Sequence, residues 1–277
     1  MSLVRRWIAE CIGPLALRPK GVVAYTMPMN TFSQVPVVVT GGSGALGRAV
    51  VSRLLDAGAE VHVPWLEERE LEDFPRAGEV ALKRVDLAEE EAVIEYYGRF
   101  ATEHCSPLWA SIHLAGGFGM APATETTKAE FERLFTMNAM TCFLCSREAI
   151  RAIRRGDASA APMVIAGSSR GPRGGRIVNV GARPAVVPVP GMIAYSVSKA
   201  AVASLTQHLA EELRPANILI NAVLPGIMDT PANRAAMPVA ERARWSKVEE
   251  VAESIVWLAS TANALTSGAL IPVYGAA

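Results

Sequence analysis

Cysteine, histidine and aromatic residues are scarce in this chain, and its charges cancel. The 277 residues include four cysteines, four histidines and 6% aromatic residues, with 27 basic and 27 acidic side chains. A chain without net charge has no field that would draw it to nucleic acid or to an anionic membrane surface, so we expect a small-molecule substrate. Cysteines this sparse in a large chain are expected to be free thiols, which indicates a reducing, cytoplasmic location.

Long apolar runs are also missing. We find no stretch of the roughly 18 consecutive apolar residues that a membrane span needs, which predicts a soluble protein. Arg5 and Arg6 precede a short apolar stretch, but Glu10 and Pro14 interrupt the run that a secretion signal requires. Because Met27 and Met29 lie just before the first predicted strand, residues 1–34 are predicted to be a disordered extension or a non-native start, and residues 35–277 to be one domain.

Two of the cysteines, Cys142 and Cys145, form a C-x-x-C pair in an apolar helical run. A zinc site would need further ligands, and no second pair accompanies them. We expect these thiols to pack a helix, with no bound metal.

Strand and helix patterns alternate from residue 35 onward. Apolar and β-branched runs predict seven strands, at residues 35–39, 60–63, 80–85, 109–114, 176–180, 218–223 and 269–273. Helical periodicity predicts helices at residues 45–57, 138–154, 194–213 and 248–259, and a Gly- and Ser-rich surface loop at residues 155–175. This alternation is typical of an α/β Rossmann fold, a doubly wound seven-stranded parallel sheet with helices on both faces.

A glycine-rich turn joins the first predicted strand to the first predicted helix. Glycine allows a tight turn whose backbone N–H groups approach a pyrophosphate, and the helix N-terminus then favours the negative charge. The turn therefore predicts a dinucleotide site, made by Thr40, Gly41, Gly42, Ser43, Gly44, Ala45, Leu46 and Gly47.

The choice between NAD and NADP stays open from the sequence. An acidic residue that holds the adenosine ribose is expected about 20 residues after the turn, at the end of the second strand. That strand runs into Pro64 and Trp65, the acids Glu67 and Glu68 come slightly late, and no obvious basic residue is placed to bind a 2′-phosphate.

Asp86 and Leu87 follow the third predicted strand. The Asp86 carboxylate could accept a hydrogen bond from the adenine amino group, or it could cap the N-terminus of the following helix. Both roles can hold at once.

Tyr195 and Lys199 are four residues apart, so a helix places them on one face. A nearby ammonium favours the phenolate and is expected to lower the tyrosine pKa from about 10, which suits Tyr195 to acid or base work on a carbonyl oxygen. By itself the pair is common, and a surface tyrosine beside a solvated lysine is the alternative.

Together with the glycine turn, this pair resembles the short-chain dehydrogenase/reductase family from residue 35 to the C-terminus. Further matches are Ala115-Gly116-Gly117 after the fourth strand, Asn138 on the next helix and Pro225-Gly226 after the sixth strand. The resemblance implies that Asn138 anchors a water in a proton relay and that Lys199 also holds the nicotinamide ribose. It further implies that Pro225, Gly226 and Ile227 line the nicotinamide, with Thr230 near its carboxamide, and that the protein forms a homodimer or homotetramer through the helices carrying Asn138 and Ala194.

Two positions depart from the family pattern. The usual asparagine pair before the Ala-Gly is replaced by His113-Leu114, and the usual catalytic serine is replaced by Ala182. Alanine at that position, in Gly181-Ala182-Arg183-Pro184, is similar to the dihydropteridine reductase branch of the family. That branch reduces a conjugated C=N ring, which accepts a hydride without a strongly polarised ketone.

Residues 228–246 are predicted to close over the substrate, because ligands of open α/β sheets lie outside the carboxyl ends of the strands. Met228, Met237 and Trp245 could contact an apolar ring or could simply pack the lid. The sequence thus favours an NAD(P)-dependent oxidoreductase acting on a small carbonyl or conjugated C=N compound, possible substrates including a pterin-like ring. A non-catalytic dinucleotide-binding sensor or scaffold is the alternative, although such a protein has less reason to retain Asn138, Tyr195 and Lys199 together.

Overall fold

A computed structural model describes residues 31, 32, 34–72, 74, 76–102, 107–159, 174–237 and 242–275. Seven parallel strands form one sheet in the order β3-β2-β1-β4-β5-β6-β9. Their bounds are Pro36–Thr40 for β1, Glu60–Trp65 for β2, Ala81–Arg84 for β3, Ala110–His113 for β4, Gly175–Val180 for β5, Ile218–Pro225 for β6 and Leu270–Val273 for β9. The predicted seven-stranded Rossmann sheet is confirmed.

The strand order reverses at β1, because β2 and β4 flank it on opposite sides. In a doubly wound sheet, ligands bind at this switch point, outside the carboxyl ends of the strands. The loops that follow β1, β4, β5 and β6 are therefore the ones expected to build a site.

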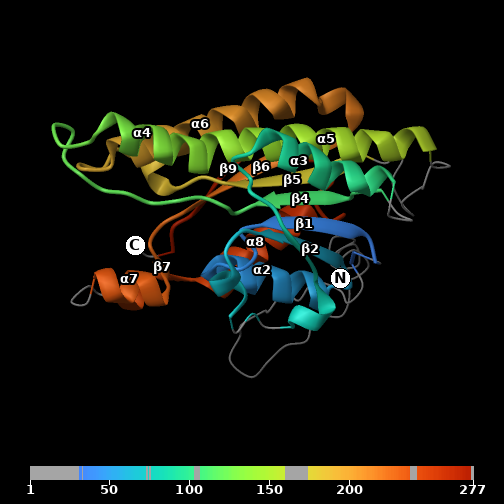
Figure 1. Ribbon diagram of the computed structural model, residues 1–277, viewed down its shortest axis with the longest axis horizontal. Helices are drawn as coiled ribbons and strands as arrows, with labels where there is room; N and C mark the ends of the chain where they lie inside the picture. Colours follow the sequence, from blue (N-terminus) through green and yellow to red (C-terminus); the bar gives the residue numbers. More distant parts are fainter. Residues whose placement is uncertain are drawn as a thin grey trace, which may run out of the picture.

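Helices cover both faces of the sheet (Figure 1). On one face lie α3 (Glu90–Gly98), α4 (Lys128–Phe135), α5 (Thr141–Ser159) and α6 (Ile193–Glu212), and a π-helical turn, η4 (Thr136–Met140), joins α4 to α5. On the other face α2 (Ala45–Asp56) packs against α8 (Val248–Ala259). The helix α7 (Pro231–Ala236) stands apart from both layers, below the edge where the strands end (Figure 1).

Each face of the sheet has its own hydrophobic core. Val37, Val39 and Val63 pack with α2 and α8 on one side, whereas Val38 and Ile177 pack with α3 and α5 on the other. Alternate residues of β1 thus face opposite layers, and all five residues of the strand are buried. Burial on both faces explains why this strand is a continuous apolar run.

Short elements complete the chain. They are the 3₁₀ turns η1 (Glu68–Leu71), η2 (Ala77–Glu79), η3 (Arg99–Ala101), η5 (Arg183–Ala185), η6 (Arg214–Ala216) and η7 (Arg242–Arg244), and a two-stranded ribbon of β7 (Met228–Asp229) and β8 (Ser246–Lys247). The ribbon ties the start and the end of the predicted lid together.

The end of α5 lies beyond its expected boundary. The predicted surface loop at 155–175 is helical up to Ser159, and β5 already begins at Gly175, so α5 is one turn longer than its apolar pattern indicates. The remainder of that loop and the proposed N-terminal extension lie outside the described residues, apart from a few residues before β1.

Cys142 and Cys145 are free, buried thiols on α5, as expected, whereas Cys11 and Cys105 lie outside the described residues. Among the residues that the structure describes, no helix is both long and apolar enough to cross a bilayer, and no cluster of metal-ligating side chains is found.

Candidate active site

The glycine turn after β1 is shaped to receive an anion at the start of α2. Gly41 has a positive φ of 65°, and a Cβ there would come within 2.6 Å of the Ala115 backbone nitrogen, so this position requires glycine. The N-cap of α2 is Gly44, no side chain caps it, and the first turn holds no acidic residue. The first N–H groups of the helix therefore lack side-chain partners, which fits a bound pyrophosphate.

Thr40 fastens this turn to the loop after β4. Its hydroxyl accepts a hydrogen bond of 3.4 Å from the Ala115 N–H, and its side chain is buried. Within the turn, Leu46 and Gly47 are buried, whereas Gly44 and Ala45 are exposed and open to a ligand. The structure therefore brings together the predicted residues of the first turn and of the Ala115-Gly116-Gly117 loop.

Asn138 joins that loop to α6. It lies in the π-helical turn η4, a wide turn of a kind often found at functional sites, and it is almost fully buried. Its side chain exchanges two hydrogen bonds of 3.0 Å with the Gly117 backbone and donates a third of 3.0 Å to the Ser198 hydroxyl. Ser198 in turn donates to the Tyr195 carbonyl at 2.7 Å, so Asn138 fixes the helix that carries the tyrosine.

Lys199 lies beside Asn138 and Gly116. A Cβ at Gly116 would come within 2.4 Å of the Asn138 Oδ1 atom and 3.4 Å of the Lys199 ammonium, so glycine here permits close approach. The ammonium donates to the Val180 carbonyl at 2.9 Å, and burial lowers its pKa to about 8. A buried ammonium without a carboxylate partner in the described part of the chain fits neutral acceptors such as ribose hydroxyls.

Tyr195 faces the same region from the start of α6. Its ring packs edge-on against Phe118, with 5.0 Å between ring centroids, and its hydroxyl forms no hydrogen bond with another described residue. Burial raises the Tyr195 pKa to about 12. The expected lowering by Lys199 is therefore wrong for this structure, because the ammonium is bonded to Val180 and desolvation of the phenol dominates.

These turns and side chains meet at one edge of the sheet, and similarity to known proteins identifies the family to which the chain belongs. Residues 36–239 match the family described as short chain dehydrogenase. The chain belongs to the short chain dehydrogenase family. As a member of it, this protein is an NAD(P)-dependent oxidoreductase.

Relatives of similar length support this assignment. Cis-4-hydroxycyclohexanecarboxylate dehydrogenase of Sinomonas cyclohexanicum is 33% identical over 262 residues, which cover 89% of this chain and 97% of the relative. Carbonyl reductase (NADPH) 2 of Sus scrofa is 32% identical over 260 residues, covering 88% and 96%. A solved short-chain dehydrogenase/reductase mutant of Serratia marcescens superposes with a TM-score of 0.72 at 26% identity, covering 87% of this chain and 97% of that one.

The position of the expected serine in this short chain dehydrogenase is occupied by a buried methyl group. Ala182 is 5% exposed and follows β5 in extended conformation, immediately before η5. The next residue, Arg183, places its guanidinium 5.4 Å from the centre of the Tyr274 ring. The serine's polarising hydroxyl is thus absent from this strand end.

Pro225, Gly226 and Ile227, which are predicted to line the nicotinamide, lead from the end of β6 into the predicted lid. Pro225 is buried, Gly226 packs against the Tyr274 backbone and Ile227 is 40% exposed. The Thr230 hydroxyl accepts a 3.2 Å bond from the Asn233 N–H and caps α7. Met228 is partly buried against the core and Trp245 is 8% exposed, so both pack at the base of the predicted lid, and their contact with a substrate stays a prediction.

Asp86 has a local role that differs from one expectation. Its carboxylate accepts a 2.9 Å bond from the Ala88 N–H, and α3 begins later, with Glu89 as its N-cap. The predicted helix-capping role is therefore wrong. The carboxylate instead stabilises a local turn by accepting a hydrogen bond from the backbone N–H two residues further on. Contact with adenine stays a prediction for Asp86 and the half-buried Leu87.

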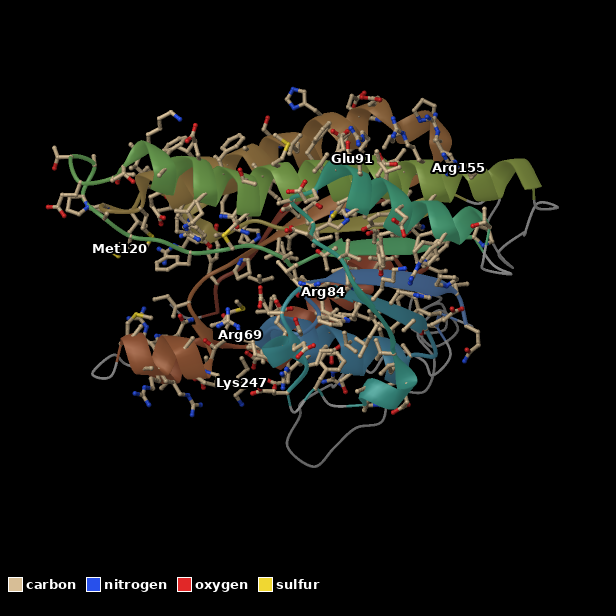
Figure 2. The ribbon with its side chains drawn as sticks, in the orientation of Figure 1. Arg69, Arg84, Glu91, Met120, Arg155 and Lys247 are labelled. Atoms are coloured by element: carbon tan, nitrogen blue, oxygen red, sulfur yellow. The ribbon has the colours of Figure 1, made fainter. Side chains whose placement is uncertain are left out.

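Sequence reasoning missed an apolar wall beside Tyr195. Phe118 and Met120, in the loop after β4, are 59% and 63% exposed, and Figure 2 shows Met120 at the edge of the sheet above α7. Met120 lines a cavity of about 240 Å³ together with Gly119, Ala121, Thr126, Glu130, Leu134, Gly191 and Ala194. Phe118 and Met120 are far from Tyr195 in the sequence, so the sequence alone did not predict that they form a wall beside it. The available signal was the presence of two large apolar residues in one loop.

A larger cavity, of about 660 Å³, lies at the amino ends of β6 and β9, away from the candidate active site.

Proposed function

We propose that this short chain dehydrogenase transfers a hydride between NAD or NADP and a small carbonyl or conjugated C=N compound. The observation that carries the proposal is the grouping of Asn138, Tyr195 and Lys199 beside the open glycine turn. A nicotinamide dinucleotide bound there supplies the hydride chemistry. The uncapped start of α2 would hold its pyrophosphate, and Lys199 its nicotinamide ribose.

Tyr195 is the proton donor in this proposal. A pKa raised to about 12 keeps its hydroxyl protonated at neutral pH, which suits donation to a substrate oxygen or nitrogen during reduction. Asn138 and Ser198 hold the backbone from which Tyr195 projects, and the lowered pKa of Lys199 makes its ammonium a ready partner in proton exchange. These features suit Tyr195 to protonate the substrate whenever the reaction runs toward reduction.

The finer proposal is a flat, conjugated substrate such as a pterin-like ring, reduced by a member of the dihydropteridine reductase-like branch. Two observations support it. Ala182 offers no hydroxyl to polarise a simple ketone, and Phe118 presents an exposed aromatic face next to the proton donor. A conjugated C=N group needs less polarisation, and a planar ring packs well against phenylalanine.

We also propose that the protein works as a homodimer or homotetramer in the cytoplasm, without nucleic-acid or membrane partners. The free, buried thiols of Cys142 and Cys145 are compatible with a reducing compartment. Exposed apolar side chains on α5 and α6 are suited to contact with a second copy.

The test is the substitution Tyr195→Phe. Purified protein is supplied with NADH or NADPH and with quinonoid dihydropterin or a panel of small carbonyl compounds, while the absorbance of the reduced nicotinamide is followed. Loss of the proton donor is expected to lower kcat by about 10²- to 10⁴-fold and to change the dissociation constant of the cofactor by less than about twofold.

Tyr96→Phe is the matched control. Tyr96 is also buried, on α3, and its hydroxyl has no hydrogen-bond partner among the described residues, so turnover should stay at the level of the parent protein. Unchanged turnover in Tyr195→Phe would contradict the proposed chemistry. Tight cofactor binding without turnover of any substrate would instead favour the sensor or scaffold function, which the retained relay residues do not favour.

A further inference from the structure

Glu70 is held against the glycine turn although it lies far from it in sequence. The Ser43 hydroxyl donates a hydrogen bond of 2.9 Å to the Glu70 Oε2 atom, across 27 residues. The other carboxylate oxygen accepts a 3.4 Å bond from the Glu67 N–H, as part of a capping box that opens η1. The half-buried carboxylate therefore has a fixed place beside the turn.

Arg48 fastens the segment that carries Glu70. Its guanidinium donates to the Ser43 carbonyl at 2.8 Å, and to the carbonyls of Glu70 and Glu72 at 3.3 Å and 2.8 Å. These bonds connect the first turn of α2 to η1. Because they go to backbone carbonyls, they position the segment while leaving the Glu70 carboxylate to its bonds with Ser43 and Glu67.

This position is where the adenosine ribose of a dinucleotide would lie. The pyrophosphate is expected at the start of α2, and the adenosine extends from there toward β2 and β3, the next strands of the sheet. The end of β2 carries Trp65 and no acidic side chain. Glu70, from the turn that follows, presents a carboxylate there instead.

The segment that carries Glu70 is predominantly acidic. Residues 67–72 contain four glutamates and one arginine, Arg69. A carboxylate accepts hydrogen bonds from ribose hydroxyls, whereas an added 2′-phosphate would place like charges together.

We infer that Glu70 selects the cofactor by binding the 2′- and 3′-hydroxyls of the adenosine ribose, and that this protein prefers NAD(H) to NADP(H). The inference rests on the proposed function, because it assumes a dinucleotide in the glycine turn. The acidic residue expected at the end of β2 is thereby assigned to η1, where the hydrogen bond with Ser43 holds the carboxylate in position.

The experiment measures dissociation constants of NADH and NADPH separately, by nicotinamide fluorescence, on the full chain. The parent protein is expected to bind NADH at least about tenfold more tightly than NADPH. Glu70→Gln keeps the side-chain shape and an oxygen that accepts from Ser43 but removes the charge, so the preference should fall by about tenfold. Glu72→Gln makes the same charge change on an exposed side chain of the same segment and should alter the preference by less than about twofold.

The melting temperature of each cofactor-free variant shows whether it is folded. If Glu70→Gln does not fold, Ser43→Ala, which removes the hydroxyl that sets the carboxylate, should reduce the preference in the same direction. Equal or tighter binding of NADPH by the parent protein, or equal effects of the two glutamine variants, overturns the inference while the proposed reductase stands. Binding of neither cofactor overturns both.

Discussion

Ala182 stands at the position where the family resemblance predicts a catalytic serine. A serine hydroxyl at this position would lie at the carboxyl end of β5, next to the loop that precedes α6 and Tyr195. Removal of one such donor lowers turnover by about 10²- to 10³-fold where the transition state needs it. The alanine is therefore informative about the substrate, and replacing it tests the substrate class.

We predict that Ala182→Ser raises kcat/KM for simple ketones by about tenfold or more, because the new hydroxyl polarises the carbonyl oxygen. For a conjugated C=N substrate the same change should alter kcat/KM by less than about twofold. The measurement is steady-state turnover of both substrate classes by both proteins. Equal gains for both classes would argue against a conjugated substrate, and a ketone activity already high in the parent protein would do the same.

At the residue level, sequence reasoning succeeded where spacing carries the geometry. Tyr195 and Lys199 share a helix face because they are four residues apart, and the structure brings them to Asn138; their catalytic roles stay predictions. Phe118 and Glu70 escaped notice because their importance depends on contacts across the fold. No local pattern specifies that Glu70 meets Ser43 or that Phe118 meets the Tyr195 ring.

At the scale of elements, a buried hydrogen-bond network connects α3, β4, β5 and α6. The Tyr97 hydroxyl lies 2.8 Å from Ser111 Oγ, which lies 2.9 Å from His113 Nε2. His113 Nδ1 lies 2.8 Å from Asn179 Oδ1, and Asn179 donates to the Thr206 hydroxyl at 2.9 Å. His113, which replaces an asparagine usual in the family, is thus the centre of a polar path through the core.

Burial lowers the His113 pKa to about 4, against about 6.5 in an unfolded chain. As pH falls from 6.5 to 4, His113 binds a proton in the unfolded chain but stays neutral in the folded protein. The free energy of unfolding therefore decreases over this range. The full loss would be on the order of 3 kcal/mol. We predict that His113→Asn weakens this pH dependence, as measured by urea unfolding at several pH values between 7 and 4.5.

His208→Asn provides the comparison, because His208 is an exposed histidine on α6 and its loss should leave the acid sensitivity intact. The slope with pH is compared within each variant, since His113→Asn also changes the network itself. An unchanged slope in His113→Asn would show that other groups cause the acid sensitivity.

Elements were predictable in kind and order, but less so at their ends. The buried strand β1 and the helix α8 have strong apolar patterns, and α8 matches its predicted bounds of 248–259. The extension of α5 to Ser159 was not predictable, because residues 155–159 have no apolar stripe. The π-helical turn at Asn138 was missed as well, since a widened turn depends on the bonds that Asn138 forms with Gly117 and Ser198.

At the scale of the whole molecule, apolar side chains remain exposed on the helices α5 and α6, which cover the same face of the sheet (Figure 1). Met140 and Phe143 are 42% and 36% exposed at η4 and the start of α5, and Ile193 and Val197 are 48% and 41% exposed on α6. An apolar surface of this kind is typical of contacts between subunits. The active-site helices themselves would then be stabilised by assembly.

We therefore predict that Phe143→Glu shifts the protein toward monomers, because it places a charge in an apolar contact between copies. Light scattering coupled to size-exclusion chromatography measures the mass of the particle, and the parent protein should have at least twice the mass of one chain. Ile94→Glu is the control: Ile94 is 42% exposed on α3, outside the proposed contact, and should leave the mass unchanged. Since α6 carries Tyr195 and Lys199, the monomer is expected to lose turnover together with its partner. If the parent protein is already monomeric and active, assembly is not needed for activity at this site. If Phe143→Glu is monomeric and folded but inactive, catalysis depends on the contact between subunits.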